Sequence, residues 1–307
     1  MNTPYGDYDS YWNLSDKFKL YSTLEGSNVK LPPFLKRVRV GEKVVLAKKD
    51  FPVIVKGTKG AGVKNNVLLG WNNHQVNNFL RQWKAKGDED GEFVIQKYIA
   101  GFICDVGGFS INGELFYNVP QKRIVMIPLR GGPAAVNEVF DEPRIIELTK
   151  EIVKRGKWTG PFDAEFRWDP EKDEYYLLEF NAKMWGSSPL SLKSNPNLVN
   201  IALNTAMGNH VEKSLEYRKG LRYRWITNQE MIAVAKGDFL DLVRYFLRFL
   251  KRSFYDVEIR DPLPDIFRFG QNIKSAVLYR DGLPTPLITK KEEKRIISRI
   301  STYQSDK

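Results

Sequence analysis

The chain has 307 residues, of which 42% are hydrophobic and 28% charged, and its formal net charge is +11. These values are typical of a soluble globular protein with one large domain or two medium ones. No apolar run in the sequence is long enough to span a membrane, the N-terminus lacks a signal-peptide core, and the single cysteine, Cys104, excludes an internal disulfide framework. We therefore expect a cytoplasmic protein whose basic charge favours anionic partners: nucleotides, acidic lipid or, as a minor alternative because the basic residues are scattered, nucleic acid.

The first pattern in chain order is a strand, a glycine-rich loop and a second strand within residues 42–71. Lys56 ends the apolar strand predicted over 52–56, and a buried lysine is costly unless it meets an anion. Gly60 and Gly62 in the following loop allow backbone N–H groups to approach phosphate oxygens. A plain hairpin turn is the more frequent explanation of such a loop when it is taken alone.

Residues 71–86 predict an amphipathic helix, and the apolar strand after it, over 94–99, runs into a stretch that stops at Gly101. Such a hinge offers free backbone N–H and C=O groups, which can hydrogen-bond an adenine ring. Further on, Arg123 and Arg130 lie around a second glycine pair, an arrangement that suits the binding of carboxylate or phosphate groups. A basic surface loop explains these two arginines about equally well.

Residues 161–190 predict a hairpin of two antiparallel strands, 161–168 and 174–180, joined by an Asp-Pro-Glu-Lys-Asp turn. Side chains alternate along a strand, so parity sorts them into two faces. One face is apolar and is expected to meet the core; its members are Phe162, Ala164, Phe166, Trp168, Tyr176, Leu178 and Phe180. The other face is polar; its members are Asp163, Glu165, Arg167, Glu179, Asn181 and Lys183.

Two acids on the polar face are expected to converge. A turn centred on Glu171 places Glu165 opposite Leu177, with Glu179 as its diagonal neighbour on the same face. Carboxylates that close repel each other unless a cation lies between them, and together with the amide oxygen of Asn181 they make a hard oxygen cluster suited to Mg²⁺. A solvated polar face of the sheet is the alternative interpretation.

The C-terminal third resembles an addition. Residues 237–254 predict a strongly amphipathic helix with one basic and one apolar face. The apolar face is expected to pack on the protein's own core, with contact of the basic helix with anionic lipid as the alternative. Residues 261–267 predict a rigid connector, and residues 289–304 a charged terminal helix.

Six short motifs occur in the order and spacing of the ATP-grasp superfamily, which the chain resembles over about residues 14–210. They read LSDKFKLY, FPVIVKGTKGAG, VIQKYIAG, RGGPAA, GPFDAEFRWD and YYLLEFNAKMWGSSPL. The chain is most similar to the carbamoyl-phosphate-synthase-like carboxylate-amine ligases. The resemblance implies an α+β protein with the ATP-grasp fold, in which the nucleotide lies between two α+β subdomains. The implied domains are a short arm over 1–16, the ATP-grasp domain over 17–210 and a mainly helical extension over 211–307. The smaller subdomain, which acts as a lid, is about 42–100.

The resemblance also implies roles for individual residues. Those implied to bind ATP are Lys17, Lys56, Gly60, Gly62, Gln96, Lys97, Ile99 and Asp105. Those implied to hold one or two Mg²⁺ (or Mn²⁺) ions, which bridge the phosphates, are Glu165, Glu179 and Asn181. The candidate catalytic residues, for contact with the transferred phosphoryl group and the substrate carboxylate, are Lys183, Arg123 and Arg130.

Three features depart from the superfamily pattern. Lys183 stands where an arginine is common, which keeps the charge but loses the planar guanidinium. Phe102 and Ile103 stand where an acid often binds the ribose, with Asp105 as the substitute. Only sixteen residues precede Lys17, where a Rossmann-like domain usually completes one wall of the site.

We predict an ATP-dependent, ADP-forming ligase that joins a small-molecule carboxylate to an amine through an acyl phosphate. The rival prediction is a catalytically impaired nucleotide-binding module that acts as a regulatory or scaffold subunit. The absent first domain and Lys183 favour it, whereas the two metal acids, Asn181 and the two phosphate lysines oppose it. The short N-terminal arm leads us to expect a homo-oligomer or a partner subunit that completes the site. Contact with an anionic membrane is a further expected partner interaction, and no specific nucleic acid is expected.

Overall fold

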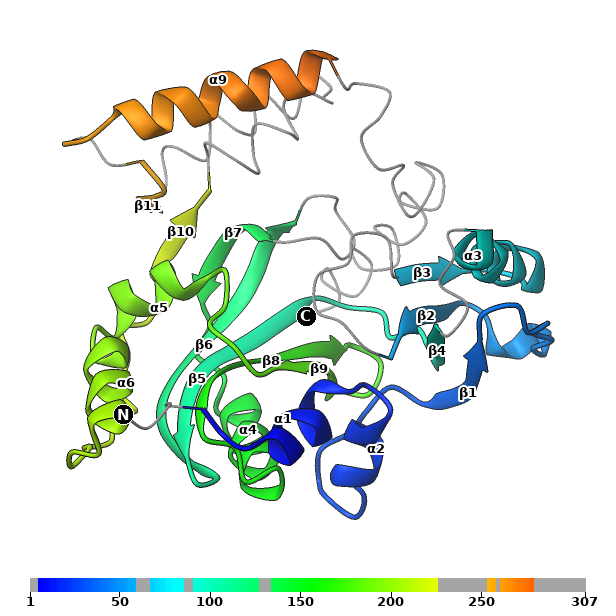
Figure 1. Cartoon of the computed structure of the whole chain (residues 1–307), viewed down its shortest axis with the longest axis horizontal. Coiled ribbons are helices and arrows are strands. Elements are labelled where there is room, and N and C mark those ends of the chain that lie inside the picture. The colour runs from blue at the N-terminus through cyan, green and yellow to red at the C-terminus, as the bar shows by residue number, and fades with distance from the viewer. Residues whose placement is uncertain are drawn as a thin grey trace.

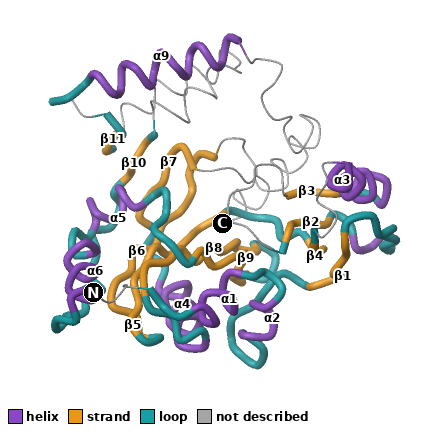
Figure 2. Tube along the Cα trace, viewed as in Figure 1, coloured by secondary structure: helices purple, strands orange, loops and turns teal. Residues whose placement is uncertain are grey.

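The computed structural model of the chain describes residues 5–58, 67–85, 91–126, 134–225, 253–257 and 260–278. Two β-sheets lie next to each other, each flanked by helices (Figure 1). Coloured by secondary structure, the strands form the interior of the larger body and the helices lie on its outside (Figure 2). This mixed arrangement is the α+β class that the sequence predicts.

The smaller sheet has four antiparallel strands in the order β1-β4-β2-β3. Its strands are β1 (Phe34–Arg39), β2 (Val53–Gly57), β3 (Val67–Gly70) and β4 (Glu92–Lys97). Alternate residues of β2 and β4 are valine, isoleucine or phenylalanine, and they form a separate core with Val76 and Leu80 of α3 (Asn73–Ala85). The strand predicted over 52–56 and the helix predicted over 71–86 are confirmed to within two residues at each end.

The larger sheet has seven strands in the order β11-β10-β7-β6-β5-β8-β9, all antiparallel except the β10–β11 pair. Its strands are β5 (Ile103–Ile111), β6 (Glu114–Met126), β7 (Ala134–Val139), β8 (Gly160–Asp169), β9 (Glu174–Asn181), β10 (Arg222–Arg224) and β11 (Phe254–Tyr255). The predicted hairpin is therefore confirmed as β8 and β9.

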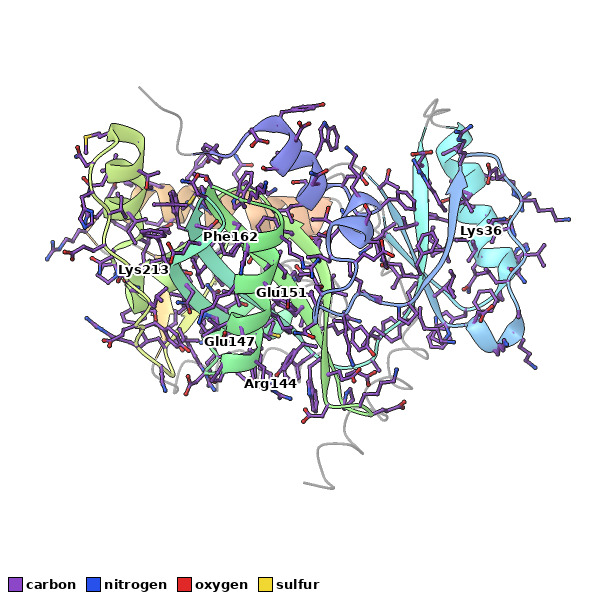
Figure 3. The ribbon with its side chains drawn as sticks, turned by 90° about the horizontal axis from the view of Figure 1, so that it is seen from below. Lys36, Arg144, Glu147, Glu151, Phe162 and Lys213 are labelled. Carbon is purple, nitrogen blue, oxygen red and sulfur yellow. The ribbon has the colours of Figure 1, made fainter. Side chains whose placement is uncertain are left out.

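One face of the larger sheet packs against three helices: α1 (Tyr8–Ser15), α2 (Lys19–Thr23) and α4 (Pro143–Arg155). Apolar side chains of β5, β8 and β9 form the main core there with residues such as Ile152 of α4 and Leu14 of α1. Figure 3 shows α4 in front of this sheet, with Arg144, Glu147 and Glu151 along the helix. Burying this face leaves the opposite face for other contacts.

The opposite face of the larger sheet is divided in two. At one end, α5 (Ser188–Ser194) and α6 (Leu198–Met207) cover apolar side chains of β5 and β6. Trp185 lies directly on the backbone of Gly107, where a Cβ atom would come within 2.3 Å of the indole ring. The remainder of this face carries charged side chains from β5, β6, β8 and β9 and lies toward the four-stranded sheet.

The described C-terminal residues add edge strands and the helix α9 (Leu263–Leu278). β10 and β11 extend the larger sheet, and α9 follows them. The prediction of a rigid connector over 261–267 is wrong: α9 begins within it, because Pro264 occupies the first turn, where a missing N–H costs nothing. The helices predicted over 237–254 and 289–304 lie outside the described residues, except that Phe254 begins β11.

Candidate active site

The β8–β9 hairpin brings the two predicted metal acids together across one register position. Glu165 lies directly opposite Glu179. The sequence predicted Leu177 at that position, and this is wrong because the register shifts between Glu165 and Phe166. Leu178 is the residue left out of the pairing, so β9 carries a β-bulge there.

The bulge also changes which residues of β9 meet the core. Tyr175, Leu177 and Phe180 pack into the main core. The predicted core position Leu178 is wrong, because it is only partly buried, and Tyr176 is buried as predicted but lies outside the main core cluster, because one extra residue reverses the alternation on the N-terminal side of the bulge. In β8, which has no bulge, all four predicted core positions pack with the core.

The three candidate metal ligands lie together on the open part of the sheet. Lys17 Nζ is 3.4 Å from Glu179 Oε2, and Asn181 Nδ2 donates a hydrogen bond of 3.2 Å to Glu179 Oε1. Arg123 forms an ion pair with Glu165. Each acid thus has a cation beside it, which offsets the repulsion between them. Among the described residues, no group of three or more His, Cys, Asp or Glu side chains could hold a metal ion, so a metal here would use two carboxylates and the Asn181 amide oxygen.

Lys56 reaches this cluster from the four-stranded sheet. Its side chain is buried, with 7% of the residue surface exposed, and its Nζ donates a hydrogen bond of 2.7 Å to the carbonyl oxygen of Leu178, the bulge residue. Burial lowers the pKa of Lys56 to about 8, an effect that Glu179 opposes and Lys17 reinforces. Burial would raise the pKa of Glu179, but Lys17 and Lys56 hold it below its ordinary value. Glu179 and Lys56 therefore stabilise each other's charged forms.

Asp105 lies at the centre of the polar face, on β5 opposite Glu165. It is 1% exposed, and its Oδ2 is 3.5 Å from Arg123 Nε. Burial raises the pKa of Asp105 to about 6, although Arg123 opposes the shift. Asp163 lies two residues before Glu165 on the same face, and burial together with the charge of Asp105 raises the pKa of Asp163 well above its usual range. The sequence placed Asp163 on this face without assigning it a role.

Buried amide and hydroxyl groups continue the polar face toward α5. Gln121, opposite Asp105 on β6, donates from Nε2 to Ser191 Oγ at 2.6 Å, and Asn137 Nδ2 donates to Gln121 Oε1 at 3.1 Å. Trp185 Nε1 donates to the same Ser191 hydroxyl at 3.3 Å. This network holds β6, β7 and α5 in one arrangement next to the acids.

The hinge between β4 and β5 carries the predicted adenine contacts. The backbone N–H of Lys97 donates to the Pro33 carbonyl at 2.9 Å. Gln96 is buried and donates to the Tyr21 hydroxyl. The carbonyl oxygen of Ile99 accepts a hydrogen bond of 3.0 Å from Arg167, a residue to which the sequence assigned no function.

The remaining predicted site residues lie apart or outside the described chain. Lys183 follows β9, is exposed, and donates its backbone N–H to the Asn181 carbonyl at 2.8 Å. Gly60, Gly62 and Arg130 lie outside the described residues. In the part of the chain that the structure describes, none of the helices has the length and hydropathy needed to cross a membrane.

Comparison with known proteins agrees with this architecture. Residues 89–229 match the family described as ATP-grasp in the biosynthetic pathway with Ter operon. The carbamoyl phosphate synthase large chain of Pyrococcus furiosus is 24% identical over 212 residues, which are 66% of this chain and 19% of that protein. The chain therefore spans about a fifth of the length of this curated relative.

Solved structures with the same fold include two ligases and a carboxylase. The biotin carboxylase of Campylobacter jejuni has a TM-score of 0.56 and 18% identity, over 70% of this chain and 50% of that one. The L-amino acid ligase of Bacillus licheniformis has a TM-score of 0.53 and 19% identity, over 67% and 53% of the two chains. The phosphoribosylamine–glycine ligase of Thermotoga maritima has a TM-score of 0.53 and 15% identity, over 69% and 58%.

Fold and matches together define the class of the protein. The chain has the ATP-grasp fold, with the four-stranded and seven-stranded sheets as its two halves. Residues 89–229 match an ATP-grasp family, and the chain is similar to carbamoyl phosphate synthase and to ligases of this fold, so the resemblance seen in its motifs is confirmed.

Proposed function

We propose that this protein is an ATP-dependent, ADP-forming ligase that joins a carboxylate to an amine through an acyl phosphate. The observation that carries the proposal is the pairing of Glu165 with Glu179 across the β8–β9 bulge, with Lys17, Lys56 and Arg123 around the two acids. Two acids on the open face of a sheet, beside three cations, are better suited to binding a metal ion and a polyphosphate than to packing in a core.

The donor set fits a divalent cation. Glu165, Glu179 and Asn181 supply carboxylate and amide oxygens, the ligands that Mg²⁺ and Mn²⁺ take in proteins. When bound, the metal would neutralise phosphate charge. Lys17 and Lys56 would bind the phosphates, because Lys17 Nζ lies 3.4 Å from Glu179 Oε2 and Lys56 Nζ bonds to the carbonyl oxygen of the adjacent residue, Leu178.

The adenine ring and the reacting groups would lie at opposite ends of the Glu165–Glu179 pair. The hinge backbone at Lys97 and Ile99 would bind the adenine ring. Arg123, with Lys183 and Arg130, would orient the substrate carboxylate and stabilise charge on the transferred phosphoryl group. Charge stabilisation and positioning would supply most of the rate, as is usual in phosphoryl transfer.

A regulatory nucleotide-binding module is the second candidate function. Lys183 favours it, because a lysine there cannot form the bidentate contact of an arginine and Lys183 is exposed. The regulatory module and the ligase would both bind nucleotide, so ADP-forming turnover is the property that distinguishes them. A homo-oligomer or partner subunit at the mouth of the site, and contact with an anionic membrane, stay predictions.

Two measurements test the proposal in sequence. Millimolar ATP with Mg²⁺ should raise the melting temperature, since a ligand at 100 times its Kd stabilises by roughly 2.7 kcal/mol. ADP release should then appear with members of a pooled library of carboxylates and amines. Absence of any Mg-ATP-dependent shift excludes both candidates, whereas a shift without ADP release under any combination favours the regulatory module.

A further inference from the structure

Arg167 is a buried cation with few compensating contacts. It lies on β8 two residues beyond Glu165, on the same face of the strand, and is 8% exposed. One terminal nitrogen donates to the Ile99 carbonyl at 3.0 Å, and the guanidinium carbon lies 5.2 Å from the centre of the Tyr98 ring. The Nε atom is buried and has no hydrogen-bond partner within the described part of the chain. No Asp or Glu among the described residues forms an ion pair with it, whereas the nearby Arg123 has both Glu165 and Asp105.

The charges around Arg167 increase this imbalance. Lys56 is buried close enough that the positive charge of Arg167 helps to lower the pKa of Lys56. Buried cations in one region repel each other, and burying a cation without an anion is expensive. The carbonyl and aromatic contacts offset part of this cost, and an anionic ligand would offset the rest.

The position of Arg167 indicates which part of a ligand it meets. On one side it holds the hinge at Ile99, and on the other it lies near Lys56, which reaches the Glu165–Glu179 pair. A nucleotide whose base lies at the hinge and whose terminal phosphates lie at the acids must pass this point with its ribose and first phosphate. Guanidinium N–H groups bind phosphate oxygens through strong charge-assisted hydrogen bonds.

We propose that Arg167 binds the first phosphate of the nucleotide through its unpaired Nε–H, next to Lys56. The proposal rests on the proposed function, because it presumes that a nucleotide occupies this site. It gives the protein a specific requirement: recognition of the nucleoside monophosphate part depends on a guanidinium at the hinge, as well as on the two lysines.

The test is the affinity of a ligand series for wild type and for Arg167→Gln, by isothermal titration calorimetry. Glutamine removes the charge and the terminal nitrogen that donates to the Ile99 carbonyl, and it keeps only a neutral N–H at about the position of Nε, so the adenosine arm of the series reports any effect that passes through the hinge. Loss of a charge-assisted bond should weaken Mg-ADP and AMP by about 10-fold or more and leave adenosine unchanged. Arg167→Lys should recover part of the loss. Arg144→Gln, an exposed arginine paired with Glu142 on α4, is the matched control and should bind all three ligands as wild type does.

The possible outcomes are distinct. Unchanged ADP and AMP affinity in Arg167→Gln overturns the inference, and so does an equal loss for adenosine, which would mean that Arg167 acts through the base or the hinge. If wild type itself binds neither Mg-ATP nor Mg-ADP, the proposed function fails and the inference with it. Melting temperatures of all variants without ligand separate a folding defect from a binding defect, and the lysine variant keeps the test open if the glutamine variant unfolds.

Discussion

At the scale of single residues, the Glu165–Glu179 pair lies on the face of the sheet that does not pack into the main core. Glu165 and Glu179 lie opposite each other on an open face, and each is held beside a cation rather than against apolar side chains. Their neighbours Phe166 and Phe180 point the other way, into the core. A change confined to the acids should therefore affect ligand binding far more than stability.

Replacement of Glu179 by glutamine tests this separation. The Glu179 side chain is 33% exposed and has polar contacts, so Glu179→Gln should cost at most about 1 kcal/mol of apo stability. It should remove the Mg-nucleotide-dependent rise in melting temperature and all turnover, because a candidate metal ligand is lost. Glu174→Gln is the control, since Glu174 lies on the same strand and pairs with Lys30 away from the site. An unfolded Glu179→Gln protein would show that the acid pair is structural and that the metal assignment is wrong.

At the scale of secondary-structure elements, the bulge in β9 decides both the core and the site. Leu177 is fully buried, whereas Leu178 is left out of the pairing and contributes its carbonyl oxygen to Lys56. The bulge brings Glu179 opposite Glu165 while keeping Tyr175 and Leu177 in the core. A regular strand could not satisfy both requirements with this sequence, because its side chains alternate strictly.

Two alanine substitutions on adjacent residues test the bulge. Leu177→Ala should lower the free energy of unfolding by roughly 2–4 kcal/mol, the cost of a cavity in a packed core. Leu178→Ala should lower it by less than about 1 kcal/mol, because that side chain is only partly buried. Urea denaturation with equal m-values measures the difference. The reverse order of costs would mean that β9 alternates without a bulge.

At the scale of the whole molecule, the site joins two sheets that have separate cores. Lys56 belongs to the four-stranded sheet but bonds to β9 of the larger one, and the backbone N–H of Lys17 donates to the Thr58 carbonyl at 3.1 Å, at the end of β2. A nucleotide bound at the acid pair would contact both sheets. Binding should therefore stabilise the two sheets together.

Hydrogen exchange can detect that coupling. In wild type, Mg-ADP should slow amide exchange in β2 and in β9, because the ligand stabilises every state in which both sheets are closed on it. In Lys56→Met the slowing in β2 should disappear. Lys36→Met is the control, since Lys36 lies on β1 of the same sheet, on the right of the view and apart from the labelled residues of α4 (Figure 3). Slowing confined to one sheet in wild type would contradict a site between the two.

Sequence patterns determined the elements whose signals are local. The β8–β9 hairpin follows from two apolar strands around an Asp-Pro-containing turn, and α3 follows from its amphipathic spacing. Alternation alone also separated Glu165 and Arg167 from the core side chains of β8. The order of the six motifs indicated the ATP-grasp fold, which the solved structures confirm.

Only the tertiary structure decided how these parts meet. The bond from Lys56 to Leu178 spans 122 positions of the chain, and the bond from Arg167 to Ile99 spans 68. Local propensity carries no information about contacts at such separations, because they arise from the packing of whole sheets. The bulge at Leu178 was also decided only by the tertiary structure. On β9, apolar side chains must face the core and acids must face the open side of the sheet. One inserted residue lets the folded sheet accommodate both.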